Sequence, residues 1–267
     1  MFSQKLSHSA QSVRFPVMSN QLLQSMFPVN LSSPTTIASH RPHRSNDQSP
    51  IPVQSCISPW LTPMVYPLLR HSVVPTFFGD ITITGQENIP RSGPVILAPT
   101  HRSRWDALIT PYATGRHVTG RDLRFMVTAD EMTGPQGWMI RQLGGFAINP
   151  RQPAIASLRF GMEILKNQEM MVIFPEGAIF RDRQIHPLRP GLARLAVQAE
   201  SNNPDLGVTI VPMDLHYCDP IPSWGTDIIV KIGQPLVVRD YCPSHMTSKA
   251  KAKHLTVALT QALENLL

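Results

Sequence analysis

Cysteine and long apolar runs are both scarce in this sequence of 267 residues. The three cysteines, Cys56, Cys218 and Cys242, are far apart and outside any C-x-x-C or Cys/His pattern, which excludes a disulfide framework and a cysteine-based metal site. We therefore expect reduced thiols in a reducing compartment. No stretch provides the roughly 20 apolar residues that a membrane-spanning helix needs, because prolines, Arg70 and His71 interrupt the most apolar region.

Acidic residues are also few, with 18 Asp and Glu against 24 Lys and Arg, for a formal net charge of +6. Residues 1–50 contain four basic residues and one acid, so half of the excess lies there. The remaining chain is only mildly basic, which favours a phosphate-bearing partner or an anionic surface and does not require nucleic acid. The content of 42% hydrophobic and 16% charged residues is typical of one globular domain, and a fibrous or wholly disordered chain is excluded.

Residues 1–50 contain eleven Ser and five Pro and few large apolar side chains. Such a segment cannot bury enough apolar surface to offset the entropy of ordering, so we predict a disordered extension. Its Ser-rich, acid-poor character also fits an organelle transit peptide, and both interpretations stay open.

Residues 51–79 are an apolar segment with several prolines. Apolar residues at spacings of three and four predict a short helix with an apolar stripe, and aromatic residues lie at its ends. One interpretation is a membrane-interface helix, and the other is a segment packed on the domain's own core. Periodicity alone favours the core interpretation.

From residue 80 to residue 267, strands and helices alternate. The predicted strands are 81–84, 94–99, 123–128, 145–148, 170–174, 208–213 and 227–232, and the predicted helices are 103–114, 130–142, 153–167, 190–200 and 247–266. Continuous apolar strands separated by helices are typical of a largely parallel sheet covered on both faces. We expect a single α/β domain with a largely parallel sheet flanked by helices.

His101 and Asp106 follow the strand that ends near Pro99. Ser103 is a good N-cap, so His101 lies just before the expected helix and Asp106 lies in its first turn, where it can face the imidazole. A carboxylate in that position would fix the tautomer of the ring while the other ring nitrogen acts as a general base. The alternative is structural, because Ser103-x-x-Asp106 is close to a capping box and a lone histidine is often part of the core.

Glu176 and Gly177 follow a second apolar strand, at the sheet edge where open α/β sheets bind ligands. We expect Glu176 to accept hydrogen bonds from a substrate hydroxyl or to hold an arginine, and Gly177 to let a backbone N–H approach a ligand. A solvated glutamate at a strand-ending turn is the alternative.

In their order and separation, three blocks resemble the glycerolipid acyltransferase family, whose best-known members are the 1-acylglycerol-3-phosphate acyltransferases. They are His101-x4-Asp106, Phe174-Pro175-Glu176-Gly177 and the strand Val208–Pro212, and the resemblance covers residues 81 to about 235. Ser103 also matches the family. The departures are Thr100, where an Asn is common before the histidine, and Ala178, where a Thr or Ser commonly follows the glycine.

The resemblance extends to a glycine-rich strand ending in Arg151, which is the candidate for holding the acceptor's phosphate with a forked guanidinium. Pro150 is an extra residue before it, so the match can be displaced by one position, and a solvated loop arginine is the alternative. Arg102, Arg104 and Arg181 are candidate helpers. Pro212, taken to close its strand, is assigned to shaping the acyl-donor side.

The resemblance implies an O-acyltransferase of phospholipid synthesis that is membrane-associated, peripheral or monotopic, and faces the cytoplasm or an organelle stroma. It implies an acyl thioester donor (acyl-CoA or acyl-carrier protein), 1-acylglycerol-3-phosphate (lysophosphatidate) as acceptor and phosphatidic acid as product. A membrane surface is the implied partner, and no metal, cofactor or nucleic acid is expected. It therefore favours the interfacial interpretation of residues 51–79. Transfer to glycerol-3-phosphate or another lysophospholipid, and a non-catalytic lipid-binding protein, are the alternatives.

Overall fold

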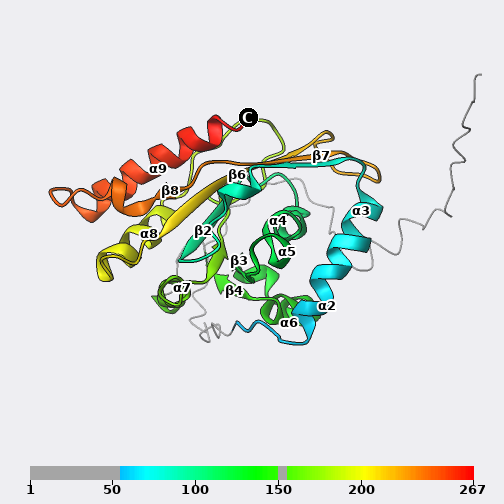
Figure 1. The fold of residues 1–267 in the computed structure, drawn as a ribbon, viewed down its shortest axis with the longest axis horizontal. Helices are drawn as coiled ribbons and strands as arrows, with labels where there is room; N and C mark the ends of the chain where they lie inside the picture. The colour runs from blue at the N-terminus through cyan, green and yellow to red at the C-terminus, as the bar shows by residue number, and fades with distance from the viewer. Residues whose placement is uncertain (1–54, 150–154) are drawn as a thin grey trace, which may run out of the picture. The chain divides into compact units, whose positions relative to one another are not determined.

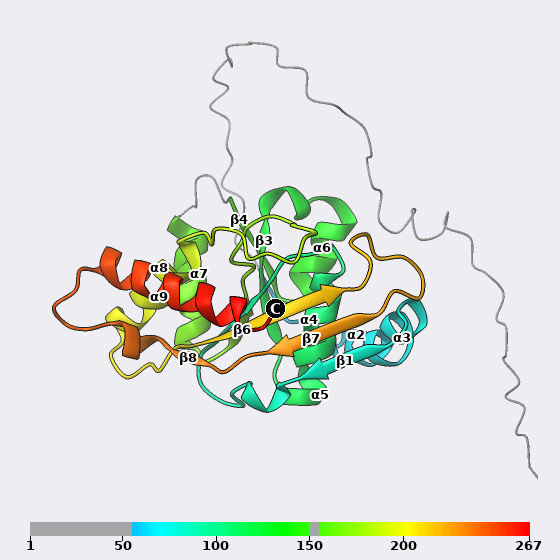
Figure 2. The same cartoon turned by 90° about the horizontal axis from the view of Figure 1, so that it is seen from above.

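The computed structural model describes residues 55–149 and 155–267, and the predicted disordered extension at residues 1–50 lies outside them. Within the described residues an eight-stranded sheet has the order β1-β7-β6-β2-β5-β3-β4, with β8 pairing with β6 (Figures 1 and 2). Its strands are β1 (Ile81–Thr84), β2 (Val95–Pro99), β3 (Leu123–Thr128), β4 (Gly145–Ile148), β5 (Met170–Val172), β6 (Thr209–Tyr217), β7 (Ile228–Ile232) and β8 (Leu236–Val237). Five pairings are parallel, and only β6 pairs with β7 and β8 antiparallel, so the largely parallel sheet is confirmed.

Helices cover both faces of the sheet, in separate groups (Figure 1). One group contains α7 (Ile155–Lys166), α8 (Gly191–Asn202) and α9 (Ser248–Glu264), and the other contains α2 (Leu61–Leu68), α3 (Val74–Phe77), α4 (Asp106–Thr114), α5 (Arg116–Thr119) and α6 (Gly134–Gln142). The strands β2, β5 and β6 send alternate side chains into two cores, such as Ile96 into the core under α8 and Leu97 into the core under α4. Because these strands are buried on both faces, their sequences are continuously apolar.

The helix at residues 61–77 combines α2, a π-helical segment η1 (Leu69–Val73) and α3. One side packs on the sheet, where Leu69, Val74 and Phe78 are buried. The other side exposes Trp60, Met64 and Leu68. The segment therefore belongs to the domain's core on one side and presents an apolar stripe on the other.

The strand β6 continues beyond Pro212 to Tyr217, so the prediction that it ends near residue 213 is wrong. Residues 209–213 pair with β2, and residues 213–217 pair with β7. The N–H of Thr209 donates toward the β2 side, to Pro94 O, so by alternation the nitrogen of Pro212 faces the junction between β7 and β8. A proline is tolerated there because no ladder hydrogen bond from that nitrogen is needed.

No helix in the described part of the chain is both long enough and apolar enough to cross a membrane.

Candidate active site

The loop that joins β2 to α4 carries the histidine singled out by sequence. The helix begins at Asp106 and not at residue 103, so the predicted helix start is wrong. The cause is the Asp106 side chain: its Oδ2 accepts hydrogen bonds from the backbone N–H groups of Arg102 (2.6 Å) and Ser103 (2.9 Å), which hold these residues in a turn before the helix. The bond from Ser103 N–H is half of a capping box, and Ser103 Oγ accepts weakly from Trp105 N–H at 3.3 Å.

The same carboxylate contacts the imidazole, as the spacing predicted. Asp106 Oδ2 lies 2.8 Å from His101 Nδ1, and Asp106 Oδ1 accepts from the Tyr217 hydroxyl at 2.7 Å. Asp106 is completely buried. A buried carboxylate is tolerated only when its oxygens are satisfied, and here four donors converge on it, counting the two backbone N–H groups.

Tyr217 was missed by sequence reasoning. It lies 111 residues from Asp106 in the chain and beyond the predicted end of its strand. Burial, followed by the charge of Asp106 and the hydrogen bond to it, raises the pKa of Tyr217 well above its ordinary value. The hydroxyl therefore keeps its proton and acts as a permanent donor to Asp106. In the sequence Tyr217 is an aromatic residue four positions beyond the predicted strand 208–213, which gives no local signal for this contact.

The ring of His101 is held on two sides. Phe174 stacks on it with ring centroids 4.1 Å apart and planes 21° apart, while Nδ1 faces Asp106. The side chain is 21% exposed, and within the described residues no protein group hydrogen-bonds Nε2. A histidine with Nδ1 tied to a carboxylate and Nε2 open is arranged to accept a proton at Nε2.

Glu176 lies beside this loop and is 2% exposed. Of the two expectations for it, the structure shows the arginine: both carboxylate oxygens lie 3.0 Å from Arg102 Nη1. Glu176 also accepts from the N–H groups of His101 (2.9 Å) and His186 (3.1 Å). A solvated glutamate is therefore excluded, and Glu176 fixes the backbone of the catalytic candidate.

Arg102 was a candidate helper for phosphate, and the structure contradicts that prediction. Its Nη1 is paired with Glu176, and its Nη2 donates to Gln184 O at 2.9 Å. The side chain is 7% exposed, so it is buried together with its partner. The guanidinium therefore links two loops, and its hydrogen-bond donors are largely used by protein groups and not by a ligand.

Gly177 has φ +70°, a left-handed conformation that favours glycine, and an added Cβ would lie 2.9 Å from Arg189 Cγ. Its N–H donates to Phe174 O at 3.2 Å, which closes the turn. The N–H of Gly177 itself is therefore used inside the turn, and the approach of a backbone N–H to a ligand at this position stays a prediction.

Thr100 replaces the family's common asparagine and joins β2 to β6. Its hydroxyl donates to Asp214 Oδ1 at 3.2 Å and accepts from Leu215 N–H at 2.9 Å. Burial raises the pKa of Asp214, and Asp214 Oδ2 is a buried atom for which the described residues provide no partner. Thr100 therefore serves the packing of the two strands beneath His101.

For the remaining predicted residues, the described part of the structure shows no contact that tests their role in substrate binding. Ser103 is 7% exposed in the loop, and Pro212 is buried in β6 beside Ala98 of β2. Arg151 lies outside the described residues. Arg104 pairs with Glu131 at 2.7 Å on the surface. The roles of Ser103, Arg151 and Pro212 in substrate binding stay predictions.

Among residues 55–149 and 155–267, no group of three or more His, Cys, Asp or Glu side chains is placed to hold a metal ion.

A family model described as Acyltransferase matches residues 80–216, about half of the chain. The match runs from β1 to within β6 and includes His101, Asp106 and Glu176.

Two curated relatives have the same name, 1-acyl-sn-glycerol-3-phosphate acyltransferase. The protein from Bacillus subtilis is 24% identical over 201 residues, covering 73% of this chain and 92% of its own length. The protein from Streptococcus pneumoniae is 27% identical over 187 residues, covering 66% of this chain and 64% of its own length, so the chain spans less than two thirds of that relative.

Among solved structures, the 1-acyl-sn-glycerophosphate acyltransferase PlsC from Thermotoga maritima matches with a TM-score of 0.57 at 20% identity. The match covers 77% of this chain and 79% of that one. This likeness shows the fold.

Replacing Tyr217 with Phe tests the hydrogen-bond arrangement around Asp106. The variant leaves Asp106 Oδ1 buried without its donor, so we expect the free energy of unfolding to fall by about 1–3 kcal/mol in urea denaturation. Tyr241→Phe is the matched control, because the described residues provide no hydrogen-bond partner for the Tyr241 hydroxyl. Equal stability of the two variants would contradict the arrangement.

Proposed function

The chain belongs to the acyltransferase family, and from this premise we propose that it moves a fatty acyl group from acyl-CoA or acyl-carrier protein to the free hydroxyl of 1-acylglycerol-3-phosphate. The product is phosphatidic acid, and the free thiol of the donor leaves. The names of the two curated relatives support the choice of acceptor. The contact between His101 Nδ1 and Asp106 Oδ2 at 2.8 Å carries the mechanism.

In the proposed step, His101 Nε2 removes the proton of the acceptor hydroxyl as its oxygen attacks the thioester carbonyl. Asp106 keeps the proton of the neutral ring on Nδ1 and stabilises the imidazolium that forms. When the tetrahedral intermediate collapses, the carbon–sulfur bond breaks and the imidazolium returns the proton to the thiolate. A thioester is already activated, so this route needs a base and oxyanion donors, and we propose that it uses no metal or cofactor.

The position of the base is supported by the loop around it. Glu176 holds the N–H of His101, and Phe180 N–H donates to His101 O at 2.8 Å, so the backbone of His101 is fixed from both directions. A preorganised base avoids the entropy cost of orienting it during the reaction. We assign Asp106 and Glu176 to positioning, and His101 alone to proton transfer.

Phosphate recognition is assigned to Arg151, with Arg104 and Arg181 as the remaining candidate helpers. A forked guanidinium suits a phosphate, but Arg104 first has to release Glu131. Arg102 is withdrawn from this role because Glu176 holds it.

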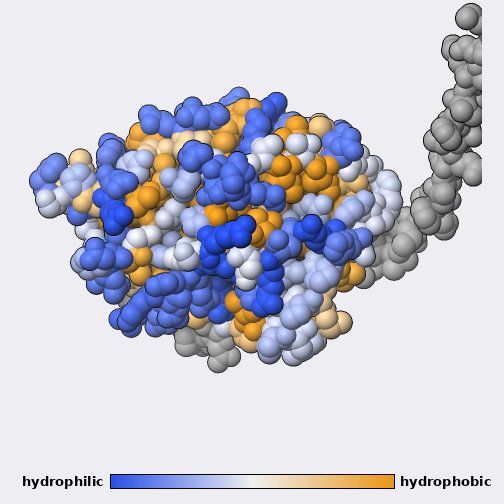
Figure 3. All heavy atoms as spheres, viewed as in Figure 1, coloured by the Kyte–Doolittle hydropathy of each residue, from blue (hydrophilic) through white to orange (hydrophobic). Residues whose placement is uncertain are grey.

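Membrane association is the second part of the proposal. Trp60, Met64 and Leu68 are 59%, 67% and 55% exposed, and a spacing of four residues places them along one side of α2. The face seen in Figure 3 shows apolar patches interrupted by hydrophilic side chains. Because donor and product are amphiphiles, we propose that this stripe inserts at the lipid interface and holds the enzyme there peripherally.

Replacing His101 with Ala tests the base. We expect kcat to fall by about 10²–10⁴-fold, the usual contribution of a general base. The assay follows a labelled acyl group from acyl-CoA, and separately from acyl-carrier protein, to lysophosphatidate in detergent. His254→Ala on α9 is the control, since it removes an exposed histidine from the opposite face of the sheet.

Near-native turnover of the His101 variant would remove His101 from the mechanism. Transfer by the wild-type protein to glycerol-3-phosphate or another lysophospholipid, with none to lysophosphatidate, would overturn the proposed acceptor.

The apolar stripe is tested by replacing Trp60, Met64 and Leu68 together with Ser. Deleting the segment would be uninformative, because Leu69, Val74 and Phe78 belong to the core. We expect the partition onto anionic vesicles in a flotation assay to fall by at least about tenfold, since three apolar side chains no longer insert. Val257→Ser on α9, 47% exposed, is the control. Unchanged flotation of the triple variant would contradict insertion of the stripe.

A further inference from the structure

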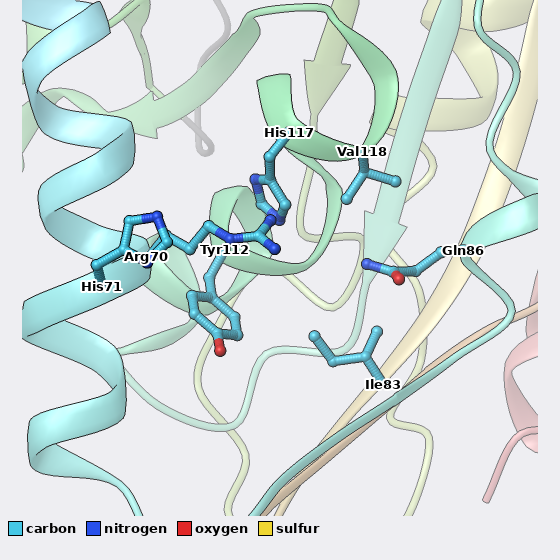
Figure 4. A pocket seen from close by; sticks show the side chains of 7 residues that line it. All are labelled: Arg70, His71, Ile83, Gln86, Tyr112, His117 and Val118. Carbon is cyan, nitrogen blue, oxygen red and sulfur yellow. The ribbon is translucent and has the colours of Figure 1, made fainter.

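A cavity of about 460 Å³ lies at the end of α4 remote from His101. Asp106 begins that helix at the active site, whereas Tyr112 near its end lines the cavity, about 9 Å further along the axis at 1.5 Å per residue. The cavity is lined by Arg70, His71, Ile83, Gln86, Tyr112, His117 and Val118 (Figure 4). It is therefore separate from the proposed catalytic centre.

The cavity is lined by three basic side chains, Arg70, His71 and His117, and by no carboxylate of the described residues. Figure 4 shows the Arg70 guanidinium reaching from the helix at residues 61–77 toward His117, with His71 beside it. Within the described residues, no carboxylate pairs with Arg70, whereas the neighbouring Arg116 is paired with Asp122. Three basic groups thus converge on one cavity without a counter-charge from the described chain.

Burial and the neighbouring basic groups both act on His117. Burial lowers the pKa of His117, and the charges of Arg70 and His71 lower it further, while a hydrogen bond involving the backbone of Tyr112 opposes them. An anion in the cavity would reverse the repulsion from Arg70 and His71 and favour the imidazolium. A bound anion would therefore favour the protonated form of His117, which the free protein disfavours.

The local structure positions the backbone segments around the cavity. Arg70 and His71 both lie in the π-helical segment η1, a type of turn that often occurs at functional sites. Gly115 lets the turn between α4 and α5 approach α2, since an added Cβ would overlap the Tyr66 ring. The side-chain amide of Gln86 donates to Ala113 O at 2.7 Å, which ties η2 (Gln86–Asn88) to the end of α4.

We propose that this cavity binds a phosphate group, carried either by a lipid headgroup or by a soluble phosphate compound. Arg70 offers a forked guanidinium, and the two histidines become donors on both ring nitrogens when protonated. The tyrosine hydroxyl of Tyr112 supplies a neutral donor at the wall. Arg70 and His71 directly follow the exposed stripe Trp60, Met64 and Leu68 on the same helix, a position within reach of a lipid headgroup.

The test follows the histidine rings of the full chain by NMR while inorganic phosphate replaces chloride at constant ionic strength. We expect the His71 and His117 resonances to move and the pKa of His117 to rise. Arg70→Gln should weaken phosphate binding by about tenfold, because one charge-assisted contact is lost. Arg194→Gln is the matched control, since it removes an exposed arginine from α8 on the opposite face of the sheet and leaves binding unchanged.

A second arm distinguishes the two sources of phosphate. Phosphatidylcholine vesicles with and without phosphatidate are added to the same labelled protein. Shifts at His71 and His117 that require phosphatidate assign a lipid headgroup, and shifts with inorganic phosphate alone assign a soluble compound. Both results support the site.

Unmoved His71 and His117 rings with both probes would overturn the proposal, and so would unchanged affinity in Arg70→Gln. The same titration of His101→Ala keeps this result separate from the proposed function, because phosphate should still bind a protein without acyl transfer.

Discussion

The burial of one carboxylate, Asp106, determines the shape of the catalytic loop. A charge removed from water destabilises the fold unless donors surround it, and four groups meet this requirement: three from the loop at residues 101–103 and the Tyr217 hydroxyl from β6. Two are N–H groups of the loop itself, so satisfying the charge also bends the backbone into the turn that presents His101. The imidazole of His101 then contacts Asp106 through Nδ1, which leaves Nε2 free to accept a proton.

A second buried carboxylate, Glu176, connects this loop to the segment that follows β5. It accepts from the backbone of both His101 and His186, and Arg102 balances its charge. Breaking such a pair by removing one partner leaves an uncompensated buried charge, so the two loops are stable only together. The parallel strands β2 and β5 bring the two carboxylates to one edge of the sheet, where ligands bind in open α/β folds.

The strands were the most predictable part of the fold, since β1, β3 and β4 match their predicted bounds, and the contact of Asp106 with His101 followed from spacing. What could not be predicted depends on partners distant in sequence. The hydrogen bond from Ser103 N–H to Asp106 keeps Ser103 in the turn before the helix. Pro212 is tolerated inside β6 because neither β7 nor β8 pairs with it. Arg102 forms an ion pair with Glu176. Tyr217 shows the same limit, because a donor 111 residues from its acceptor leaves no local pattern.

The tautomer of His101 decides whether the ring can act as the proposed base, because that role requires its proton on Nδ1 and a free Nε2. The nitrogen chemical shifts of the labelled ring, assigned by comparison with His101→Ala and recorded at a pH where the imidazole is neutral, distinguish the two tautomers. We expect a protonated Nδ1 and an unprotonated Nε2 in the wild-type protein, with this preference lost in Asp106→Asn. A ring protonated on Nε2 in the wild-type protein would contradict it.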